Sequence, residues 1–472
     1  MVDSKKTKED MFAKLPSEWP QDLRSRIQTK VQASKRKIVV LDDDPTGTQT
    51  VHGIPVLTDW AVETLRAQMA NDLPAFYVLT NSRSFTLDVA QSINTEIGRN
   101  LNEAASQVDC QFAVVSRSDS TLRGHFPGEV DALAKALEKD FDGWIITPFF
   151  PEGGRYTIDS VHYVDEGGWM IPAAETEFAR DRVFGYQSSN LCRWVEEKTG
   201  GRVAAHDVSS VLIKDLREGG PERVASFLSQ LQRGGICAVD AASYRDLEVL
   251  VLGLLRAEEQ GKKFLYRTAA SFVQVRSGLW PRALLTAADL NMSEIGGGLI
   301  IVGSYVPRTS EQLEKLLAQP HIIRLEVSVE ALVDQKRRRN EIVRAAQKSD
   351  HALKEGKDVV IYTSRQLVPG KDTASSLSIG QSISQGLVSI LDKISATPRY
   401  IISKGGITAS DIATQALKVK MAMVCGQILP GVPVWKLGNE SRYPDLAYIV
   451  FPGNVGDSGA LVDVFSKLKH RL

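Results

Sequence analysis

Residues 39–50 read VVLDDDPTGTQT, and the interpretation of the whole chain starts from this stretch. A short apolar run, residues 38–41, ends in three adjacent aspartates, Asp42, Asp43 and Asp44, and a turn-forming Pro-Thr-Gly follows them. A buried strand of a parallel sheet delivers polar side chains to its carboxyl end in this way. Three adjacent carboxylates repel one another, so they persist most easily beside a metal ion, a cationic group or water. The stretch therefore indicates the floor of an active site, with a solvated acidic turn as the alternative for the aspartates alone.

The same succession of apolar strand, polar loop and helical stretch recurs after residue 37. The strands that it predicts in the first part of the chain are residues 38–41, 75–80, 112–115, 143–147, 204–208, 236–239 and 263–266. Carboxyl ends of parallel strands meet at one edge of a sheet, so we expect the loops that follow them to lie together. The pattern predicts an open α/β sheet that carries its ligand groups on that edge.

A second α/β pattern begins after the triple glycine at residues 296–298, where the composition changes. Its predicted strands are residues 299–302, 358–362, 400–403 and 448–451. At 472 residues the chain is also too long for one ordinary domain. We therefore expect an N-terminal extension over residues 1–35 and two domains over residues 36–292 and 293–472, each α/β with a mostly parallel sheet.

The charge and the cysteine pattern exclude several classes of protein. Lysine plus arginine and aspartate plus glutamate each total 57, so the formal net charge is zero, which argues against a general nucleic-acid binder. The four cysteines are far apart with no CxxC pair, which argues against a disulfide framework or a zinc site. No apolar run is long enough to cross a membrane, and the N-terminus has no apolar signal core. We expect a cytoplasmic protein that binds neither nucleic acid nor membranes.

Three loops of small residues follow predicted strands of the second domain. Lys404-Gly405-Gly406 joins a strand to a helix and offers unobstructed backbone amides at the positive end of a helix dipole, which favours phosphate. Lys404 adds a charge and Thr408 a hydroxyl, and the loops at residues 303–304 and 453–456 follow equivalent strands. One glycine-rich turn is usually structural, but three in one domain indicate a nucleotide site. Neither GxxxxGK[ST] nor GxGxxG follows a strand, which argues against a P-loop or a conventional dinucleotide-binding domain.

Arginines recur at the strand ends of the first domain, with serine, threonine and aspartate around them. These arginines are Arg83, Arg117, Arg123 and Arg155. Arginine binds carboxylates and phosphates through two hydrogen bonds, hydroxyls and aspartate bind polyols, and an aspartate can deprotonate an attacking hydroxyl. The combination suits a small polyhydroxy acid, although a surface ion pair is the alternative for any one arginine. Two histidines, His125 and His162, are further candidates for the site.

Several short motifs follow one another between about residue 37 and residue 465. They are Asp43-Asp44-Pro45-Thr46-Gly47, Ser118-Asp119-Ser120-Thr121-Leu122-Arg123-Gly124, Gly303-Ser304, Lys404-Gly405-Gly406-Ile407-Thr408 with Ser410-Asp411, and Gly431-Val432-Pro433 ahead of Pro452-Gly453-Asn454-Val455-Gly456. In this order and combination they resemble the four-carbon acid sugar kinase family, a group of two-domain ATP-dependent kinases acting on threonate, erythronate or 3-oxo-tetronate.

The resemblance implies that the N-terminal domain binds the sugar acid and the C-terminal domain binds ATP, with Mg²⁺ assisting the transfer. By position, the implied sugar-acid contacts are Asp43, Asp44, Arg83, Ser118, Asp119 and Arg123, and the implied nucleotide contacts are Ser304, Gly405, Gly406, Thr408, Gly453 and Gly456. Members commonly carry a small residue where this chain has Asp42 and an asparagine where it has His125, and their last glycine loop differs from residues 452–456. The motifs thus indicate the kinase class and leave the particular tetronate open.

These observations lead to one hypothesis and two alternatives. The hypothesis is in-line transfer of the γ-phosphoryl group of ATP to the terminal hydroxyl of a four-carbon sugar acid, in an active site in the interdomain cleft. The roles that it assigns are a base or metal anchor for Asp43 or Asp44, the substrate carboxylate for Arg117 and Arg123, and phosphates for Lys404 with the Gly405 and Gly406 amides. The alternatives are a sugar-phosphate isomerase or lyase on a similar fold, and a non-catalytic two-domain ligand-binding protein. A homodimer is left open.

Overall fold

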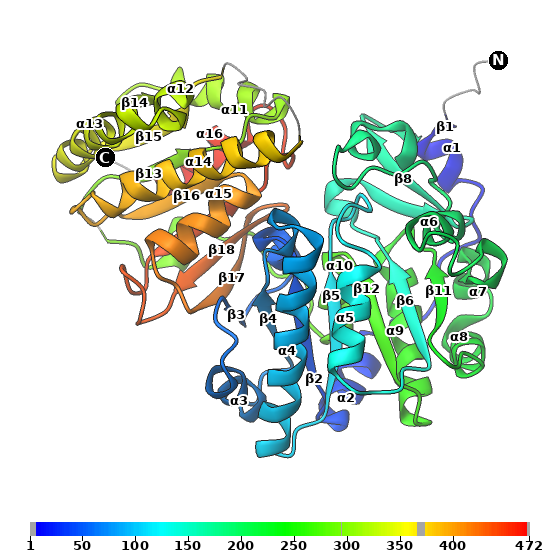
Figure 1. Cartoon of the computed structure of the whole chain (residues 1–472). Coiled ribbons are helices and arrows are strands. Elements are labelled where there is room, and N and C mark those ends of the chain that lie inside the picture. The colour runs from blue at the N-terminus through cyan, green and yellow to red at the C-terminus, as the bar shows by residue number, and fades with distance from the viewer. Residues whose placement is uncertain (1–5, 294, 366–372, 470–472) are drawn as a thin grey trace. The chain divides into compact units, whose positions relative to one another are not determined.

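The computed structural model describes residues 6–293, 295–365 and 373–469. It divides into two compact units, whose elements are labelled in Figure 1. The first unit comprises Met1–Val51 with Asp59–Pro281, and the second comprises His52–Thr58 with Arg282–Leu472. Each unit is an α/β fold built around mostly parallel strands, as the sequence predicted. Residues 52–58 were not expected in the second unit, because so short a segment has no periodicity that shows which strands it will join.

The strands of the first unit run parallel to their described neighbours throughout its main sheet. Their order is β10 (Ser209–Val211), β11 (Gly235–Val239), β6 (Gly143–Thr147), β12 (Phe264–Thr268), β5 (Phe112–Arg117), β2 (Lys37–Asp42) and β4 (Ala75–Leu79). Every residue of β2 is buried, because helices cover both faces of a parallel sheet and leave a central strand no solvent side.

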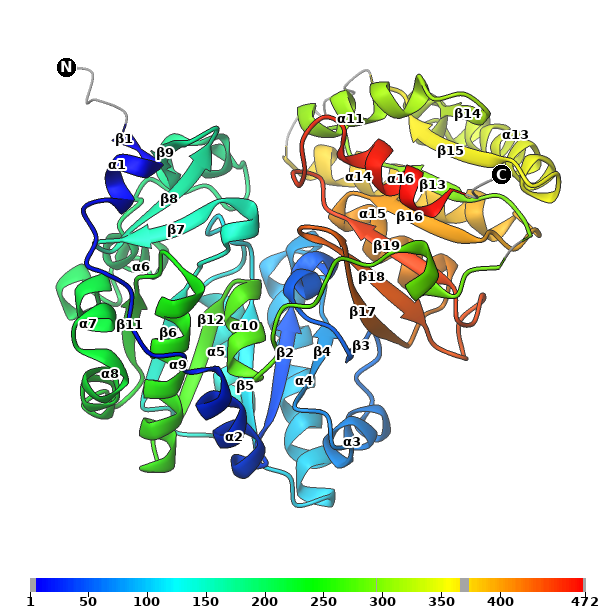
Figure 2. The same cartoon turned by 180° about the vertical axis from the view of Figure 1, so that it is seen from behind.

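Helices cover the two faces of this sheet. They are α2 (Arg24–Ser34), α3 (Val62–Ala70), α4 (Leu87–Gln107), α5 (Gly128–Ala136), α6 (Leu191–Lys198), α7 (Ile213–Arg217), α8 (Gly220–Ser229), α9 (Tyr244–Glu259) and α10 (Ala270–Arg276). Figure 1 shows α4 and α5 on one face, and Figure 2 shows α2, α9 and α10 on the other. Within the part of the chain that the structure describes, no helix is both long and apolar enough to span a bilayer.

A small antiparallel sheet completes the first unit. Its order is β1 (Lys6–Thr7), β9 (Trp169–Pro172), β8 (Val161–Glu166) and β7 (Arg155–Ile158), and a short helix, α1 (Lys8–Phe12), follows β1. The prediction of a strand at residues 204–208 was wrong. Ala205–Asp207 forms a 3₁₀ turn, closed by a hydrogen bond of 2.9 Å from the Asp207 amide to the Ala204 carbonyl, and the strand is β10 instead. Pairing with β11, which lies distant in the sequence, decides where this strand begins.

The second unit has parallel strands at its centre and an antiparallel flank. The order is β3 (Ile54–Leu57), β17 (Met421–Leu429), β18 (Val432–Leu437), β19 (Ala447–Phe451), β16 (Tyr400–Lys404), β13 (Leu299–Val302), β15 (Asp358–Thr363) and β14 (Ile322–Val327). The strands from β19 to β14 are parallel, and those from β3 to β19 are antiparallel. Parallel order brings the carboxyl ends of β13, β16 and β19 to one edge.

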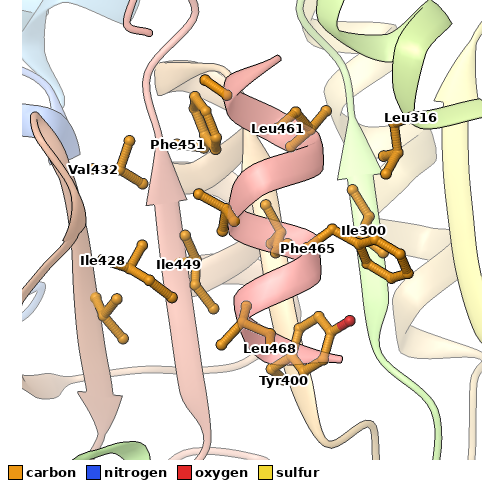
Figure 3. Close-up of a cluster of buried hydrophobic side chains, with 14 of the residues drawn as sticks. Ile300, Leu316, Tyr400, Ile428, Val432, Ile449, Phe451, Leu461, Phe465 and Leu468 are labelled. Atoms are coloured by element: carbon orange, nitrogen blue, oxygen red, sulfur yellow. The ribbon is translucent and has the colours of Figure 1, made fainter. Parts of the chain in front are cut away.

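The helices of the second unit bury their apolar faces against these strands. They are α11 (Pro307–Leu317), α12 (Val329–Val333), α13 (Gln335–Lys354), α14 (Thr373–Asp392), α15 (Gly406–Asp411) and α16 (Ala460–Leu468). Figure 3 shows Leu461, Phe465 and Leu468 of α16 packed over Ile449 and Phe451 of β19, all of them buried. The spacing of three and four residues along α16 places these side chains on one face of the helix. This core fixes the strand edge from which the glycine loops project.

Candidate active site

In the first unit, the predicted site residues lie at or just after the ends of neighbouring strands. Asp42, the last residue of β2, is in register with Arg117, the last residue of β5, and Arg117 is in register with Thr268 at the end of β12. Backbone hydrogen bonds continue beyond the strands: the Ser118 amide donates to the Thr268 carbonyl at 2.9 Å, and the Thr80 amide donates to the Asp42 carbonyl at 2.9 Å. The loops after β2, β4, β5 and β12 therefore start side by side.

Each of the three adjacent aspartates has a different partner. Asp42 accepts a hydrogen bond of 2.9 Å from Nη1 of Arg117, and Asp44 forms an ion pair of 2.7 Å with Nη2 of Arg83. Asp43 accepts a hydrogen bond of 2.6 Å from the Ser118 hydroxyl through Oδ2. Its other oxygen, Oδ1, is buried and has no hydrogen-bond partner among the described residues, although both arginines lie within 3.6 Å. The cluster is thus a network of alternating charges, and the alternative of a solvated acidic turn does not hold.

Two glycines are needed for this close approach. A Cβ atom at Gly47 would lie 2.1 Å from Oδ2 of Asp42. Gly124 has φ of +128°, and a Cβ there would lie 2.8 Å from the Ser118 hydroxyl and 3.2 Å from Oδ2 of Asp43. Glycine alone combines the positive φ with the missing side chain at the second position. The two short motifs around these glycines therefore have a physical reason in the packing around the aspartates.

Burial and neighbouring charges separate the pKa values of the three aspartates. Burial raises the pKa of Asp42 to about 7, despite the opposing charge of Arg117. Burial also raises the pKa of Asp43. Burial acts in the same direction on Asp44, but Arg83 and Arg117 outweigh it and leave the pKa of Asp44 below its usual value. The site therefore offers one firmly ionised carboxylate beside two that take up protons more readily, the arrangement that acid–base chemistry needs.

Asp119 joins Arg83 to Arg123. Its Oδ2 accepts a hydrogen bond of 2.7 Å from Nε of Arg123, and its Oδ1 lies 3.3 Å from Nη1 of Arg83. Burial opposes ionisation of Asp119, but the two arginines and the Thr121 hydroxyl lower its pKa well below the usual range. Arg123 also lies over the Phe178 ring, 5.2 Å from its centroid, and the guanidinium of Arg155 lies over the same ring at the same distance.

The two candidate histidines have different surroundings. His162 is fully buried, with Nε2 2.7 Å from the Ser120 carbonyl oxygen and Nδ1 3.0 Å from the Thr157 hydroxyl. Burial lowers the pKa of His162 to about 4, so the ring is neutral at physiological pH. Both ring nitrogens are engaged in these hydrogen bonds, so the ring supports the loop after β5. His125 lies nearer the surface, where Nε2 is 3.0 Å from the Phe85 carbonyl oxygen.

One buried charge pair at the same edge was not predicted as part of the site. Arg267, the fourth residue of β12, forms an ion pair with Glu129 of α5 and donates a hydrogen bond of 2.8 Å to the Ser116 hydroxyl. The Ser82 hydroxyl donates a hydrogen bond of 2.7 Å to the other oxygen of Glu129. The polar residue at the end of a predicted strand was the signal for Arg267, but nothing in the sequence indicated Glu129, which lies inside a helix.

A small cavity of about 20 Å³ lies beside the cluster. Its lining residues are Ser118, Asp119, Leu122, Arg123, Ile146, Pro148, Trp194, Arg267 and Thr268. This volume holds about one water molecule, so a ligand with several hydroxyl groups would lie mostly outside it.

In the second unit, side chains of α11 form hydrogen bonds to two of the three predicted glycine loops. The Thr309 hydroxyl, near the start of α11, donates to the Gly453 carbonyl at 3.0 Å and lies 3.2 Å from the Ser304 hydroxyl. The side-chain amide of Gln312, one turn further along α11, donates to the carbonyl oxygens of Val455 at 3.0 Å and of Asp457 at 2.7 Å. The loops after β13 and β19 therefore form one wall, which Thr309 and Gln312 hold together although neither was predicted.

The glycines of these loops allow close contact between their backbones. Gly405 has φ of +113°, and a Cβ there would lie 2.9 Å from Cβ of Ser304. A Cβ at Gly303 would lie 2.3 Å from the Thr408 hydroxyl, and one at Gly453 would lie 3.4 Å from the Ser304 hydroxyl. The structure thus brings Ser304, Gly405, Thr408 and Gly453 together, with Gly406 opening α15, whereas Gly456 lies nearer the start of α16.

Cations surround this edge. Arg365, two residues after the end of β15, donates a hydrogen bond of 2.7 Å to the Ser304 carbonyl and another to the Ser310 hydroxyl of α11. Arg308 is exposed on α11. Among the described residues, neither arginine forms an ion pair with a carboxylate, nor does Lys404. An edge with glycine loops and unpaired cations suits a polyphosphate.

Lys404, which was predicted to bind phosphate, lies buried beneath the loop after β19. Its side chain is fully buried, and Nζ donates hydrogen bonds to the carbonyl oxygens of Pro452 and, at 3.2 Å, of Gly453. Burial lowers the pKa of Lys404 well below its usual value, and the nearby charge of Arg308 acts in the same direction. In this structure Lys404 supports the loop after β19 from below, and direct contact with phosphate remains a prediction.

The described residues do not form a cage for a metal ion. No group of three or more histidine, cysteine, aspartate or glutamate side chains within them is arranged to hold one. Asp42 and Asp44 already have arginine partners, and Asp43 has only one orphaned oxygen. Mg²⁺ commonly binds through one or two carboxylates plus the phosphates of a nucleotide, so a nucleotide-bound Mg²⁺ would not need such a cage.

Comparison with known proteins assigns a separate domain model to each of the two units. A model of a sugar-binding N-terminal domain matches residues 38–276, and a model of a nucleotide-binding C-terminal domain matches residues 299–461. The first match contains the aspartate and arginine cluster, and the second contains the three glycine loops. The fold and the two sites therefore define a protein with one sugar-binding and one nucleotide-binding domain.

Two relatives carry the names of particular kinases. D-Erythronate kinase from Heliobacterium modesticaldum is 25% identical over 328 residues, which are 67% of this chain and 69% of the relative. 3-Oxo-tetronate kinase from Cupriavidus necator is 25% identical over 338 residues, which are 68% of this chain and 71% of the relative. The chain belongs to the four-carbon acid sugar kinase family, as its motifs indicated.

Two solved structures share the fold. A crystal structure of a Salmonella typhimurium LT2 protein matches with a TM-score of 0.65 and 18% identity, covering 90% of this chain and 98% of that protein. Haemophilus influenzae protein HI1011 matches with a TM-score of 0.58 and 21% identity, covering 91% and 100%. At these identities the likeness concerns the fold alone.

Proposed function

We propose that the protein is an ATP-dependent kinase that phosphorylates the terminal hydroxyl of a four-carbon sugar acid, namely threonate, erythronate or 3-oxo-tetronate, with MgATP as the phosphoryl donor. The observation that carries the proposal is the different chemistry of the two strand edges. One edge combines aspartates of unlike pKa with arginines, and the other combines glycine loops with cations that have no carboxylate partner among the described residues. Family membership and the names of the two relatives support the same reaction.

Asp43 is the residue that we assign as the base. Its Oδ1 atom is buried without a hydrogen-bond partner in the described part of the chain, and Oδ2 is held by the Ser118 hydroxyl. Burial raises the pKa of Asp43 towards the working pH, and a general base is most effective when its pKa lies near that pH. Asp44, which stays ionised, would hold Arg83 in place and so keep Arg83 beside Asp119. Asp43 would then accept the proton of the attacking hydroxyl.

The loops of the second unit would bind the phosphates of ATP. Backbone amides at Gly405 and Gly406, the hydroxyls of Ser304 and Thr408, and the charge of Arg365 are the groups available there. Phosphoryl transfer depends mainly on positioning and charge neutralisation, which these groups supply without forming covalent bonds. Direct transfer requires the two substrates to meet, so closure of the domains around them is part of the proposal.

An assay of ADP release tests the function. The panel consists of D- and L-threonate, D- and L-erythronate and their 3-oxo forms with MgATP, and mass spectrometry identifies the phosphorylated product. Turnover of one member well above the others would establish the kinase and its substrate together. A thermal shift with ATP but no turnover on the panel would move the acceptor to another sugar acid. Absence of both a nucleotide shift and turnover would reject the proposal in favour of an isomerase, a lyase or a binding protein.

A further inference from the structure

Arg155, at the start of β7 in the small antiparallel sheet, differs from Arg83, Arg117 and Arg123 in having no carboxylate partner among the described residues. The pairs of the other three are Arg83 with Asp44 at 2.7 Å, Arg117 with Asp42 at 2.9 Å and Arg123 with Asp119 at 2.7 Å. No described carboxylate lies within ion-pair distance of Arg155, and its Nε atom is buried without a hydrogen-bond partner among the described residues. The side chain as a whole is only half-buried, so the rest of the guanidinium stays within reach of a ligand.

An unpaired cation in such a place is unfavourable for the protein alone. Burial lowers the pKa of Arg155, and the charge of Asp119, which raises it, is opposed by that of Arg123. Desolvating a charged group without a partner costs free energy that a nearby aromatic ring returns only in part. The Arg155 guanidinium can therefore bind a carboxylate through two hydrogen bonds, and no described residue of the protein supplies that carboxylate.

The backbone holds Arg155 in place. It is the first residue of β7, and its amide and carbonyl exchange hydrogen bonds of 2.9 and 3.1 Å with Phe150. The turn between them contains Gly154, with φ of +75°, whose carbonyl accepts a hydrogen bond of 2.7 Å from the Asp165 amide. These bonds fix the backbone, and the Phe178 ring, 5.2 Å from the guanidinium carbon, orients the end of the side chain, so a ligand would meet a partly preorganised guanidinium.

We propose that Arg155 binds the carboxylate of the sugar acid and is the residue that makes this protein select an acid over the corresponding polyol. The inference rests on the proposed function for the identity of the ligand. Arg123, on the same Phe178 ring, would approach the carboxylate from the other side while keeping its bond to Asp119. Arg117, which is buried and bonded to Asp42, then has a structural role and does not bind the substrate carboxylate.

The test compares acids with polyols of the same carbon chain. Arg155→Met and Arg155→Lys are measured in the full-length protein with the preferred tetronate and with threitol and erythritol, which lack the carboxylate. We expect Arg155→Met to lower kcat/KM for the acid about 100-fold and to leave the slow reaction of the polyols within about threefold of wild type. Arg155→Lys keeps the positive charge but not the two-pronged guanidinium, so its kcat/KM for the acid should lie between those of wild type and Arg155→Met. Equal losses on acid and polyol, or no loss on either, would overturn the proposal.

Stability separates ligand binding from a merely structural role. Removing a half-buried cation that has no described carboxylate partner should leave the melting temperature of the ligand-free protein unchanged or raise it, whereas replacing a structural arginine would lower it. Arg193→Met, at an exposed position of α6, is the matched control and should change neither selectivity nor melting temperature. A lower melting temperature of Arg155→Met together with unchanged selectivity would reject the proposal.

A binding experiment keeps this inference distinct from the kinase itself. Calorimetric titration measures the affinities of the tetronates and of the two polyols for wild type and for Arg155→Met without any turnover. If wild type phosphorylates none of them but binds an acid that Arg155→Met does not bind, the proposed reaction fails and the role of Arg155 stands. If wild type phosphorylates an acid and Arg155→Met binds it equally well, the reaction stands and the role of Arg155 fails. If wild type binds no acid at all, both fail.

Discussion

Three chemically identical side chains, Asp42, Asp43 and Asp44, acquire different properties because each meets a different neighbour. Arg83 keeps Asp44 ionised, whereas burial raises the pKa of the other two. A carboxylate transfers protons most effectively when its pKa lies near the working pH. At the scale of single residues, the protein therefore assigns roles by partner rather than by residue type.

Replacement of the aspartates tests these roles. Asp43→Asn keeps the shape but removes the base, so kcat should fall by about 10²- to 10⁴-fold while the affinity for the sugar acid changes little. Asp44→Asn removes the partner of Arg83 and should abolish turnover by weakening acid binding as well. Steady-state kinetics and calorimetry on both variants check the difference. ATP affinity should stay near wild type in both, and an equal loss of ATP binding would contradict the assigned roles.

His162 gives a pH dependence with a defined sign. Its pKa is 6.5 in an unfolded chain and about 4 in the folded one, so between these values the unfolded state binds more protons. The stabilising contribution is fully present above pH 6.5 and is lost as the pH falls towards 4, by at most about 1.4 kcal/mol per pH unit. His162→Gln removes this titration. Urea unfolding at several pH values should show the stability difference between wild type and His162→Gln shrinking as the pH falls.

The control for this experiment is His206→Gln. The His206 side chain is 85% exposed, whereas the His162 ring is fully buried. Replacement of His206 should leave the pH dependence of stability as in wild type. A parallel curve for His162→Gln would show that the ring is not held neutral in the folded protein.

At the scale of elements, the loops after β13, β16 and β19 matter more than any one residue in them. Their strands are parallel neighbours, so three glycine-containing turns meet at one edge. Backbones approach one another there more closely than side chains would allow, as the contact between Gly405 and Ser304 shows. The turns thus act as a single surface, and a change in one displaces its neighbours.

Gly405→Ala tests this arrangement. The added Cβ would lie 2.9 Å from Cβ of Ser304 at a backbone φ of +113°, so the loop must shift. We expect the affinity for ATP to fall at least about tenfold, which corresponds to about 1.4 kcal/mol, while the sugar acid binds as in wild type. Calorimetry with each ligand separately measures both. Gly380→Ala is the control, because a Cβ there meets nothing within 4 Å and alanine favours a helix.

At the scale of the whole molecule, the order of the chain and the order of the units do not coincide. Residues 52–58 lie early in the sequence, yet β3 pairs antiparallel with β17 of the second unit and is fully buried. The nucleotide-binding unit therefore contains a strand from the N-terminal part of the chain. Its stability depends on a segment that no nucleotide motif marks.

Val56→Asp should destabilise the nucleotide-binding unit, although Val56 is far from every nucleotide motif in the sequence. Val56 is 1% exposed and in register with Ala422, and an uncompensated charge there should cost about 3–5 kcal/mol. Urea unfolding measures the loss, and the thermal shift with ATP should decrease. Ala67→Asp, at an exposed position of α3, makes the same charge change and should alter neither measurement. Full retention of ATP binding by Val56→Asp would contradict the assignment of β3 to this unit.

Much of the fold could be predicted because strands and glycine turns have local signatures. The buried strand β2 reads as an unbroken apolar run, and the loops at Gly405 and Gly453 follow such runs. The prediction of a strand at residues 204–208 was wrong because these five residues, AAHDV, are too few to show a period that distinguishes a strand from a turn. Glu129, Thr309 and Gln312 escaped prediction because residues inside helices carry no local sign of what they face across the fold.

The sequence by itself therefore determined the α/β class, the strand edges that carry polar residues and the glycine loops, since periodicity and backbone freedom are properties of neighbouring residues. Only the tertiary structure decided which arginine each aspartate meets, that Lys404 lies beneath its loop and that β3 joins the second unit. It also showed that Arg155 has no acidic partner among the described residues. Charges act over a few ångströms of space, and strands distant in the sequence supply them.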